Sequence, residues 1–480
     1  MLADHDVEDE PLTSYFADVT RECNAFRILL IGKSGSGKST LVNEVFDFEY
    51  EGSATSDYSV GDHDINRPIL SSTNRSLILH DSKGLESGSD KNLNIVKRFL
   101  NDRKNGPVAD QLHAIWYCVE IPLGGERLFE GGDLALLEYL KSSSVPLIVV
   151  FTKLDKLQFS ERMRLQKEYA SKGQDSKAMR NAKEQYVAAA AKKYQSSCID
   201  VLQSPNIPKA WSHYCAVSMK QPQTIITLIE LTKSLLDSSE TLDVLFSQAQ
   251  MPDVNYKVNL SLRAGKNMYR MGMFASALPL KGIRKVSLLK VLSVIHSDIV
   301  QVWNLQDPDE ILLGANMRTM IRRLFVEPLI LPALDCVAAA SDGNSAQIIA
   351  NIAGACFNPA TLIGPAVSNT VKILDDIADA TPSAARVLMA YIIDLTLGME
   401  SLHWLVRHKD GKTASEKDVI EAFSHYHVSE NRKEAHKKIR NFIGDENILL
   451  SIQRDKVLSK AGEIVGKCRI DPKKMFKGRQ

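Results

Sequence analysis

The chain has 480 residues, of which 44% are hydrophobic, 24% charged and 7% aromatic. This composition is typical of folded proteins and excludes an intrinsically disordered chain, a collagen-like fibre and a small disulfide scaffold. The 59 Lys and Arg residues nearly balance the 58 Asp and Glu residues, so the formal charge of +1 predicts no general attraction to nucleic acid. Seven scattered cysteines without a CxxC pair favour reduced thiols and a cytoplasmic location.

Residues 1–22 are expected to form an acidic, flexible leader. The first eleven residues carry five acids and neither Lys nor Arg. A secretory signal begins with basic residues, and a mitochondrial leader is rich in arginine and poor in acids. The segment therefore fits neither targeting class.

Short apolar runs alternate with helical segments through the first half of the chain. We expect helices at 93–100 and 134–140, and buried strands at 26–31, 77–80, 114–119, 147–151 and 214–217. Strands that alternate with helices predict an α/β domain with a doubly wound, mostly parallel sheet and helices on both faces. We place this domain at residues 23–240.

A charged, Ala-rich stretch between about residues 156 and 213 predicts a helical insertion in this domain. Residues 161–193 contain nine Lys or Arg residues and four acids. A solvated helical face explains this pattern most simply, and a basic docking surface is the alternative.

From residue 250 to residue 480 the pattern predicts an all-helical C-terminal domain. Residues 286–303 repeat apolar side chains at spacings of three and four, as an amphipathic helix does. Residues 343–371 carry no formal charge, but polar residues and two prolines interrupt them. A spanning helix needs about 20 mostly apolar residues, so we favour a buried helical hairpin or a partner surface over membrane insertion.

A phosphate-binding motif occupies residues 32–39, GKSGSGKS, which match GxxxxGKS with a strand before and a helix after. Glycines let the backbone wrap phosphates, and the N–H groups then form an anion nest at a helix N-terminus. Lys38 is expected to reach the β- and γ-phosphates as the catalytic cation, and Ser39 to bind Mg²⁺. The predicted nucleotide-binding residues of this loop are Gly32, Ser34, Gly35, Ser36, Gly37, Lys38, Ser39 and Thr40.

The tetrapeptide Asp81-Ser82-Lys83-Gly84 follows the second expected strand. A carboxylate at a strand end can hold Mg²⁺, so Asp81 is assigned to the metal. The N–H group of Gly84 is expected to meet the γ-phosphate.

Two later motifs, also at strand ends, are expected to read the base. The first is Thr152-Lys153-Leu154-Asp155, which looks like the NKxD motif of GTPases with Thr in the Asn place. The Asp155 carboxylate can accept hydrogen bonds from guanine N1–H and the exocyclic amine, while the Lys153 stem lies along the base. The second is the segment Ser218-Met219-Lys220, which resembles the SAK loop and directs a backbone N–H group at guanine O6.

Together these motifs give the chain a resemblance to translation-factor-class P-loop GTPases, related to the Era-like and septin-like groups. It more closely resembles the "G domain-containing" proteins common in fungi. The sequences that carry the resemblance are IGKSGSGKSTLVN, HDSKGLESG, FTKLDKL and VIHSDIVQVWNLQDP. The G-domain likeness covers roughly residues 22–240, and the fungal likeness extends loosely into the helical half. The resemblance implies binding of GTP, GDP and Mg²⁺.

Two positions depart from the GTPase pattern. The switch threonine that caps Mg²⁺ in such proteins is best matched by Ser59. After Gly84, where Ras-like enzymes have a water-orienting Gln, this chain has Leu85, which cannot hydrogen-bond a water. Leu85 is therefore assigned to the catalytic position as an apolar replacement, unless Glu86 or Ser87 positions the water.

The leading hypothesis is a slow GTPase that hydrolyses GTP to GDP and phosphate and acts as a nucleotide switch. Its turnover is expected to depend on a homodimer or a protein activator, because the attacking water lacks a partner. The alternative is a nucleotide-binding scaffold with negligible turnover. An ATPase is disfavoured because Asp155 would lose its guanine partners. We expect neither nucleic acid nor a membrane among the partners.

Overall fold

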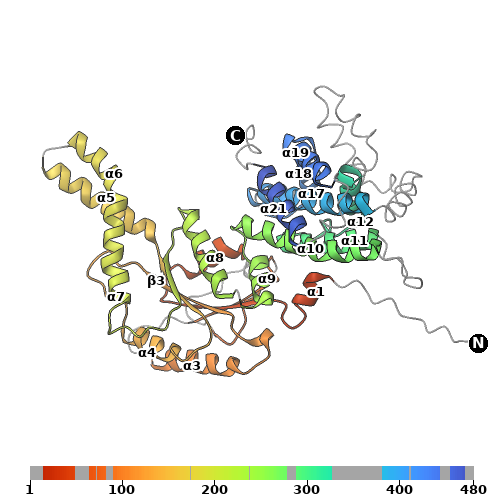
Figure 1. Cartoon of the computed structure of the whole chain (residues 1–480). Coiled ribbons are helices and arrows are strands. Elements are labelled where there is room, and N and C mark those ends of the chain that lie inside the picture. Colours follow the sequence, from red (N-terminus) through yellow and green to blue (C-terminus); the bar gives the residue numbers. More distant parts are fainter. Residues whose placement is uncertain are drawn as a thin grey trace, which may run out of the picture. The chain divides into compact units, whose positions relative to one another are not determined.

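The computed structural model describes residues 14–48, 64–71, 73–82, 90–172, 175–236, 238–277, 288–326, 381–409, 412–443 and 454–470. The chain divides into two compact units (Figure 1). The sheet unit comprises Thr20–Asp253, and the helical unit comprises the described parts of Met1–Val19 and Val254–Gln480.

Within the described residues, the sheet unit is built on five parallel strands in the order β2-β1-β3-β4-β5. Every residue of β1 and of β4 is buried, as expected of central strands covered on both faces. The strands are β1 (Phe26–Ile31), β2 (Leu77–Asp81), β3 (Ala114–Glu120), β4 (Leu147–Thr152) and β5 (His213–Ala216). All five expected strands are present, and the α/β prediction is confirmed.

Helices cover both faces of this sheet, which makes it doubly wound. Helices α3 (Asp90–Lys104) and α4 (Gly131–Leu140) lie on one face, and α8 (Pro222–Leu236) and α9 (Glu240–Ala249) lie on the other (Figure 1). Helix α2 (Lys38–Phe46) follows β1, and the short 3-10 helix η1 (Val108–Asp110) precedes β3.

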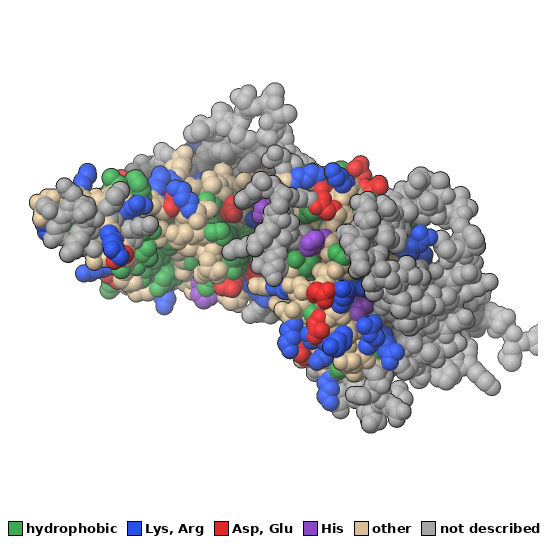
Figure 2. Space-filling view, turned by 90° about the horizontal axis from the view of Figure 1, so that it is seen from above, with side chains coloured by type: hydrophobic (Ala, Val, Ile, Leu, Met, Phe, Trp, Pro, Cys, Tyr) green, Lys and Arg blue, Asp and Glu red, His purple; other side chains and the backbone are tan. Residues whose placement is uncertain are grey.

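The expected insertion at 156–213 is helical. Helices α5 (Leu154–Ser171) and α6 (Asp175–Tyr194) pack along each other as a pair that projects from the sheet (Figure 1). The chain then continues through the π-helix η2 (Gln195–Ile199) and α7 (Asp200–Leu202). Figure 2 shows hydrophobic side chains exposed among Lys and Arg on the part of the surface that these helices form.

The helical unit is organised around α17 (Thr381–Arg407), which packs against six of the other helices that the structure describes in this unit. Gly398 allows the helix that carries Phe423 to pack closely against α17, because a Cβ at this position would lie 2.2 Å from the Phe423 ring. The other helices that the structure describes between Val254 and Gln480 are α10 (Val254–Ala277), α11 (Leu288–Trp303), α12 (Ala315–Ile321), η3 (Arg322–Val326), α18 (Glu416–Val428), α19 (Glu430–Phe442) and α21 (Arg454–Cys468).

Three side chains form a polar network inside the helical unit. The Tyr426 hydroxyl donates to Asp394 Oδ1 at 2.7 Å, and His436 Nε2 lies 2.7 Å from Asp394 Oδ2. All three side chains are buried. Burial and the neighbouring carboxylate raise the pKa of Tyr426 well above its ordinary value.

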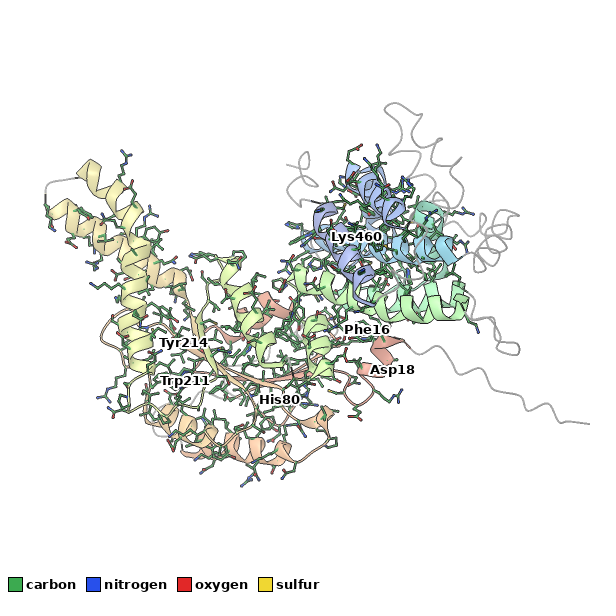
Figure 3. The ribbon with its side chains drawn as sticks, in the orientation of Figure 1. Phe16, Asp18, His80, Trp211, Tyr214 and Lys460 are labelled. Atoms are coloured by element: carbon green, nitrogen blue, oxygen red, sulfur yellow. The ribbon has the colours of Figure 1, made fainter. Side chains whose placement is uncertain are left out.

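Part of the expected leader, 1–22, is folded instead of flexible. Helix α1 (Tyr15–Val19) buries Tyr15 and Phe16 in the helical unit and contacts α10 (Figure 3). Its N-terminus meets the buried carboxylate of Asp298, which accepts hydrogen bonds from the Ser14 hydroxyl and the Tyr15 N–H. Two aromatic side chains and a buried acceptor explain why this part of the acidic segment is ordered. Residues 1–13 lie outside the described residues.

The uncharged stretch 343–371 also lies outside the described residues. Among the helices that the structure describes, none has both the length and the apolar character needed to cross a bilayer.

Candidate nucleotide-binding site

The phosphate-binding motif forms a tight loop between β1 and α2. Gly32 has φ 151°, and a Cβ there would lie 2.3 Å from the Cys118 carbonyl oxygen of β3. Gly37 caps α2 in the left-handed region with φ 90°. Both backbone conformations are rare for residues with a Cβ, so the two glycines allow the loop to follow this path against the sheet.

Lys38 lies at the centre of this loop. Its ammonium donates to the carbonyl oxygens of Gly32, at 2.8 Å, and of Lys33, at 3.3 Å. The same Nζ atom lies 3.8 Å from Asp81 Oδ1 at the end of β2. The structure therefore brings together the predicted phosphate-binding lysine and the predicted metal-binding carboxylate.

The residues around Lys38 fit a hydrated Mg²⁺. Ser39 is exposed in the first turn of α2, and Asp81 supplies a carboxylate beside Lys38. Mg²⁺ prefers such oxygen ligands and usually keeps waters and nucleotide phosphates in its shell. Within the described residues no group of three or more His, Cys, Asp or Glu side chains could hold a metal ion.

Thr152 connects the phosphate loop to β4. Its buried hydroxyl donates to the Ser36 carbonyl oxygen at 2.6 Å, so this side chain holds the phosphate loop against the end of β4. The Ser36 hydroxyl is also buried and has no hydrogen-bond partner among the residues that the structure describes. Thr152 thus positions the loop, although the motif had suggested a role near the base.

Lys153 and Asp155 follow at the start of α5. Lys153 adopts the left-handed region with φ 62°, and its ammonium pairs with Glu120 at 2.5 Å. Asp155 lies in the first turn of α5 and remains partly exposed, with 25% of its side chain accessible. The carboxylate that is predicted to read the base is therefore accessible from solvent.

The loop after β5 lies next to Asp155. The Ser218 hydroxyl donates to Asp155 Oδ1 at 3.2 Å, and Lys220 Nζ lies 3.4 Å from Oδ2. The Ser218 N–H donates to Thr224, and the Lys220 N–H donates to the Ser218 hydroxyl. The Met219 N–H has no partner in the described part of the chain and can donate to a ligand.

Sequence reasoning missed several residues that hold these loops. Glu120 ends β3 and is paired with Thr152 in the sheet register, which explains its contact with Lys153. Lys33 in the phosphate loop pairs with Glu130, at the N-cap of α4, at 2.6 Å. A cavity of about 680 Å³ borders the loop beside this ion pair. No motif marks these partners, because each comes from another strand or helix.

Three predicted positions lie outside the described residues. They are Ser59, assigned to Mg²⁺, Gly84, assigned to the γ-phosphate, and Leu85, assigned to the catalytic position. Their assignments stay predictions.

Comparison with known proteins agrees with this geometry. Residues 27–153 match the family described as "50S ribosome-binding GTPase", and residues 311–475 match a "Domain of unknown function (DUF8505)". The GTPase Der of Campylobacter concisus (strain 13826) is 28% identical over 136 residues, which cover 28% of this chain and 27% of that protein. The chain thus spans about a quarter of the length of this curated relative.

The solved structure of an oligomerised bacterial dynamin pair also aligns with the chain. That pair is described as providing a mechanism for the long-range sensing and tethering of membranes. The alignment covers 97% of this chain and 92% of that one, with 10% identity and a TM-score of 0.26.

The sheet, the phosphate loop and the family match define the class of this part of the molecule. Residues 27–153 belong to a G domain of the P-loop GTPase class. The chain accordingly joins a domain of the P-loop GTPase fold to a helical unit in which residues 311–475 match a second family.

Proposed function

We propose that this protein binds GTP and GDP with Mg²⁺, hydrolyses GTP slowly and acts as a nucleotide switch. The proposal rests on one observation: the residues predicted to bind the phosphates and those predicted to bind the base lie along the same edge of the sheet. The Thr152 hydroxyl joins β4 to the phosphate loop, and Asp155 lies beside the loop whose Met219 N–H has no partner among the described residues. Ligands of open α/β sheets bind at this carboxyl edge.

Lys38 and the backbone N–H groups of the phosphate loop supply the chemistry on the protein side. They stabilise negative charge on the β- and γ-phosphates, and this electrostatic stabilisation contributes most of the catalysis in phosphoryl transfer. When bound, Mg²⁺ would be held by Ser39 and Asp81 and would neutralise part of the phosphate charge. Leu85 offers no hydrogen bond to a water, which motivates the expectation of slow turnover without a second copy or a protein activator.

Phosphate release tests the proposal when it is measured over a hundredfold range of protein concentration. We expect turnover far below the enzyme median of about 10 per second, with specific activity that rises with concentration or with an added activator. The Lys38→Ala variant gives the background rate of phosphate release, the blank for this assay. Release that does not exceed this blank would favour the scaffold hypothesis. Fast turnover with constant specific activity would show that one copy suffices.

A further inference from the structure

Exposed apolar side chains gather on the α5–α6 hairpin, which comprises Leu154–Ser171 and Asp175–Tyr194. Among the described residues, eight large hydrophobic side chains are exposed, and three of them belong to this hairpin. Phe159 is 64% exposed, Val187 51% and Met163 39%. Phe159 is the most exposed of all eight, so the hairpin carries an unusual apolar surface.

Helix α5 has two apolar faces. Leu157 and Leu165 are buried on the face that packs against the protein. Phe159, Met163 and Lys167 are four residues apart and therefore form a different stripe. This second stripe faces solvent, because all three side chains are exposed. Packing within the sheet unit does not explain it.

The charge beside this stripe is positive. The acids Glu161, Glu168 and Glu184 are all engaged in ion pairs within the hairpin. Three cations, in contrast, have no acidic partner among the described residues: Arg162, Lys167 and Lys192. Residues 161–193 hold nine Lys or Arg residues and four acids, so the hairpin presents net positive charge next to apolar side chains.

In place of the expectation that no membrane is among the partners, we propose that the α5–α6 hairpin is a peripheral membrane-binding element that docks on anionic phospholipid. Phe159 and Met163 would enter the headgroup region, while Arg162 and Lys167 would contact lipid phosphates through their long, flexible stems. Basic residues near an anionic leaflet are attracted electrostatically. The projecting helical pair (Figure 1) can meet a flat surface without displacing the sheet.

Charge and chemistry favour this partner over two others. A second copy of the hairpin would bring two positive surfaces together, which is unfavourable. A nucleic acid would satisfy the cations but leave Phe159 and Met163 exposed. An anionic bilayer surface accommodates both kinds of side chain, and the proposal does not depend on GTP hydrolysis.

Vesicle sedimentation of the full chain without nucleotide tests the proposal. We expect binding to vesicles of phosphatidylcholine with about one third phosphatidylserine, weaker binding at high salt, and little binding to pure phosphatidylcholine. Phe159→Ser with Met163→Ser should reduce the affinity at least tenfold, and Lys167→Glu should reduce it less. Ile95→Ser and Lys91→Glu, on α3, are matched controls, because they change an exposed apolar and an exposed charged residue outside the hairpin.

Phe159→Trp gives a second readout that removes no apolar surface. Its fluorescence should shift to the blue with phosphatidylserine vesicles and stay unchanged with pure phosphatidylcholine. The proposal is overturned if wild-type protein does not sediment with the anionic vesicles, or if the α3 controls lose as much binding as the hairpin variants. Self-association that is abolished by Phe159→Ser would assign the stripe to a second copy and would also overturn it.

Discussion

The two compact units use polar side chains in different ways. In the sheet unit, Lys38, Asp81 and Asp155 lie in or beside loops at strand ends, where a ligand can reach them. In the helical unit, the Asp394 side chain lies inside the protein, and the hydrogen bonds described for it join it to Tyr426 and His436. The first arrangement is the one expected of a binding site, whereas the second links α17, α18 and α19 through buried contacts. A single substitution of these side chains should therefore reduce ligand affinity in the sheet unit and stability in the helical unit.

Lys38→Ala should produce the largest effect, because it removes the cation at the centre of the phosphate loop. We expect triphosphate affinity to fall at least a hundredfold, about 2.7 kcal/mol, as measured with a fluorescent GTP analogue. Lys33→Ala is the matched control, since that ammonium pairs with Glu130 and should change affinity only slightly. Equal GTP affinity in Lys38→Ala and wild type would contradict the assigned role of the loop.

Asp394→Ala should damage the helical unit alone. The Tyr426 hydroxyl and the His436 ring would lose their buried acceptor, which should cost about 3–5 kcal/mol. Hydrogen exchange of α17, α18 and α19 measures this loss, and nucleotide affinity should not change. Tyr426→Phe is a milder control, expected to cost about 1 kcal/mol. If Asp394→Ala cost less than about 1 kcal/mol, the network would not stabilise the helical unit.

Acid should weaken both units through buried histidines, among them His80 in the sheet unit and His296 in the helical unit. Burial lowers the pKa of His80 and of His296 to about 4, from an ordinary 6.5. The unfolded chain then binds more protons between pH 6.5 and pH 4, so stability is full above this window and falls as the pH decreases through it. Each histidine should cost about 2 kcal/mol at about pH 5.

Hydrogen exchange of β2 and α11, corrected for the intrinsic effect of pH, checks this prediction. His296→Gln should reduce the acid sensitivity of α11 and leave that of β2 unchanged. Equal acid sensitivity of α11 in the variant and in wild type would exclude His296 as the cause.

Ser14→Ala should give the smallest effect. It removes one of the hydrogen bonds to Asp298, while the Tyr15 N–H remains bonded. We expect a loss of about 1 kcal/mol in protection of α1 and α11 against hydrogen exchange. Unchanged protection of α1 would indicate that this helix does not depend on the Asp298 contact.

The sequence predicted the sheet unit better than the helical unit for a physical reason. Phosphate binding requires glycines, a lysine and a helix start at fixed spacing, so the loop from Gly32 to Ser39 is recognisable without neighbours. The contact between Lys153 and Glu120 depends on the pairing of two strands, and the contact between Asp394 and His436 joins residues 42 positions apart. Neither leaves a local pattern. The folding of α1 likewise could not be predicted locally, because Asp298, which contacts its N-terminus, lies 284 positions away from Ser14.

Asp155→Asn tests the base-recognition part of the site. The amide keeps one acceptor oxygen for guanine but replaces the other with an NH2 donor, which could bond to the extra carbonyl of xanthine. The variant should therefore bind GTP more weakly and xanthosine triphosphate more tightly than wild type does. Unchanged preference would remove Asp155 from the site.

The central claim is that the site recognises guanine nucleotides. Titration of the wild-type chain with fluorescent GDP and with fluorescent ADP, each with and without Mg²⁺, measures this most directly. The account predicts that GDP binds at least tenfold more tightly than ADP, about 1.4 kcal/mol, through Asp155 and the Met219 N–H. Equal affinity for GDP and ADP would contradict it.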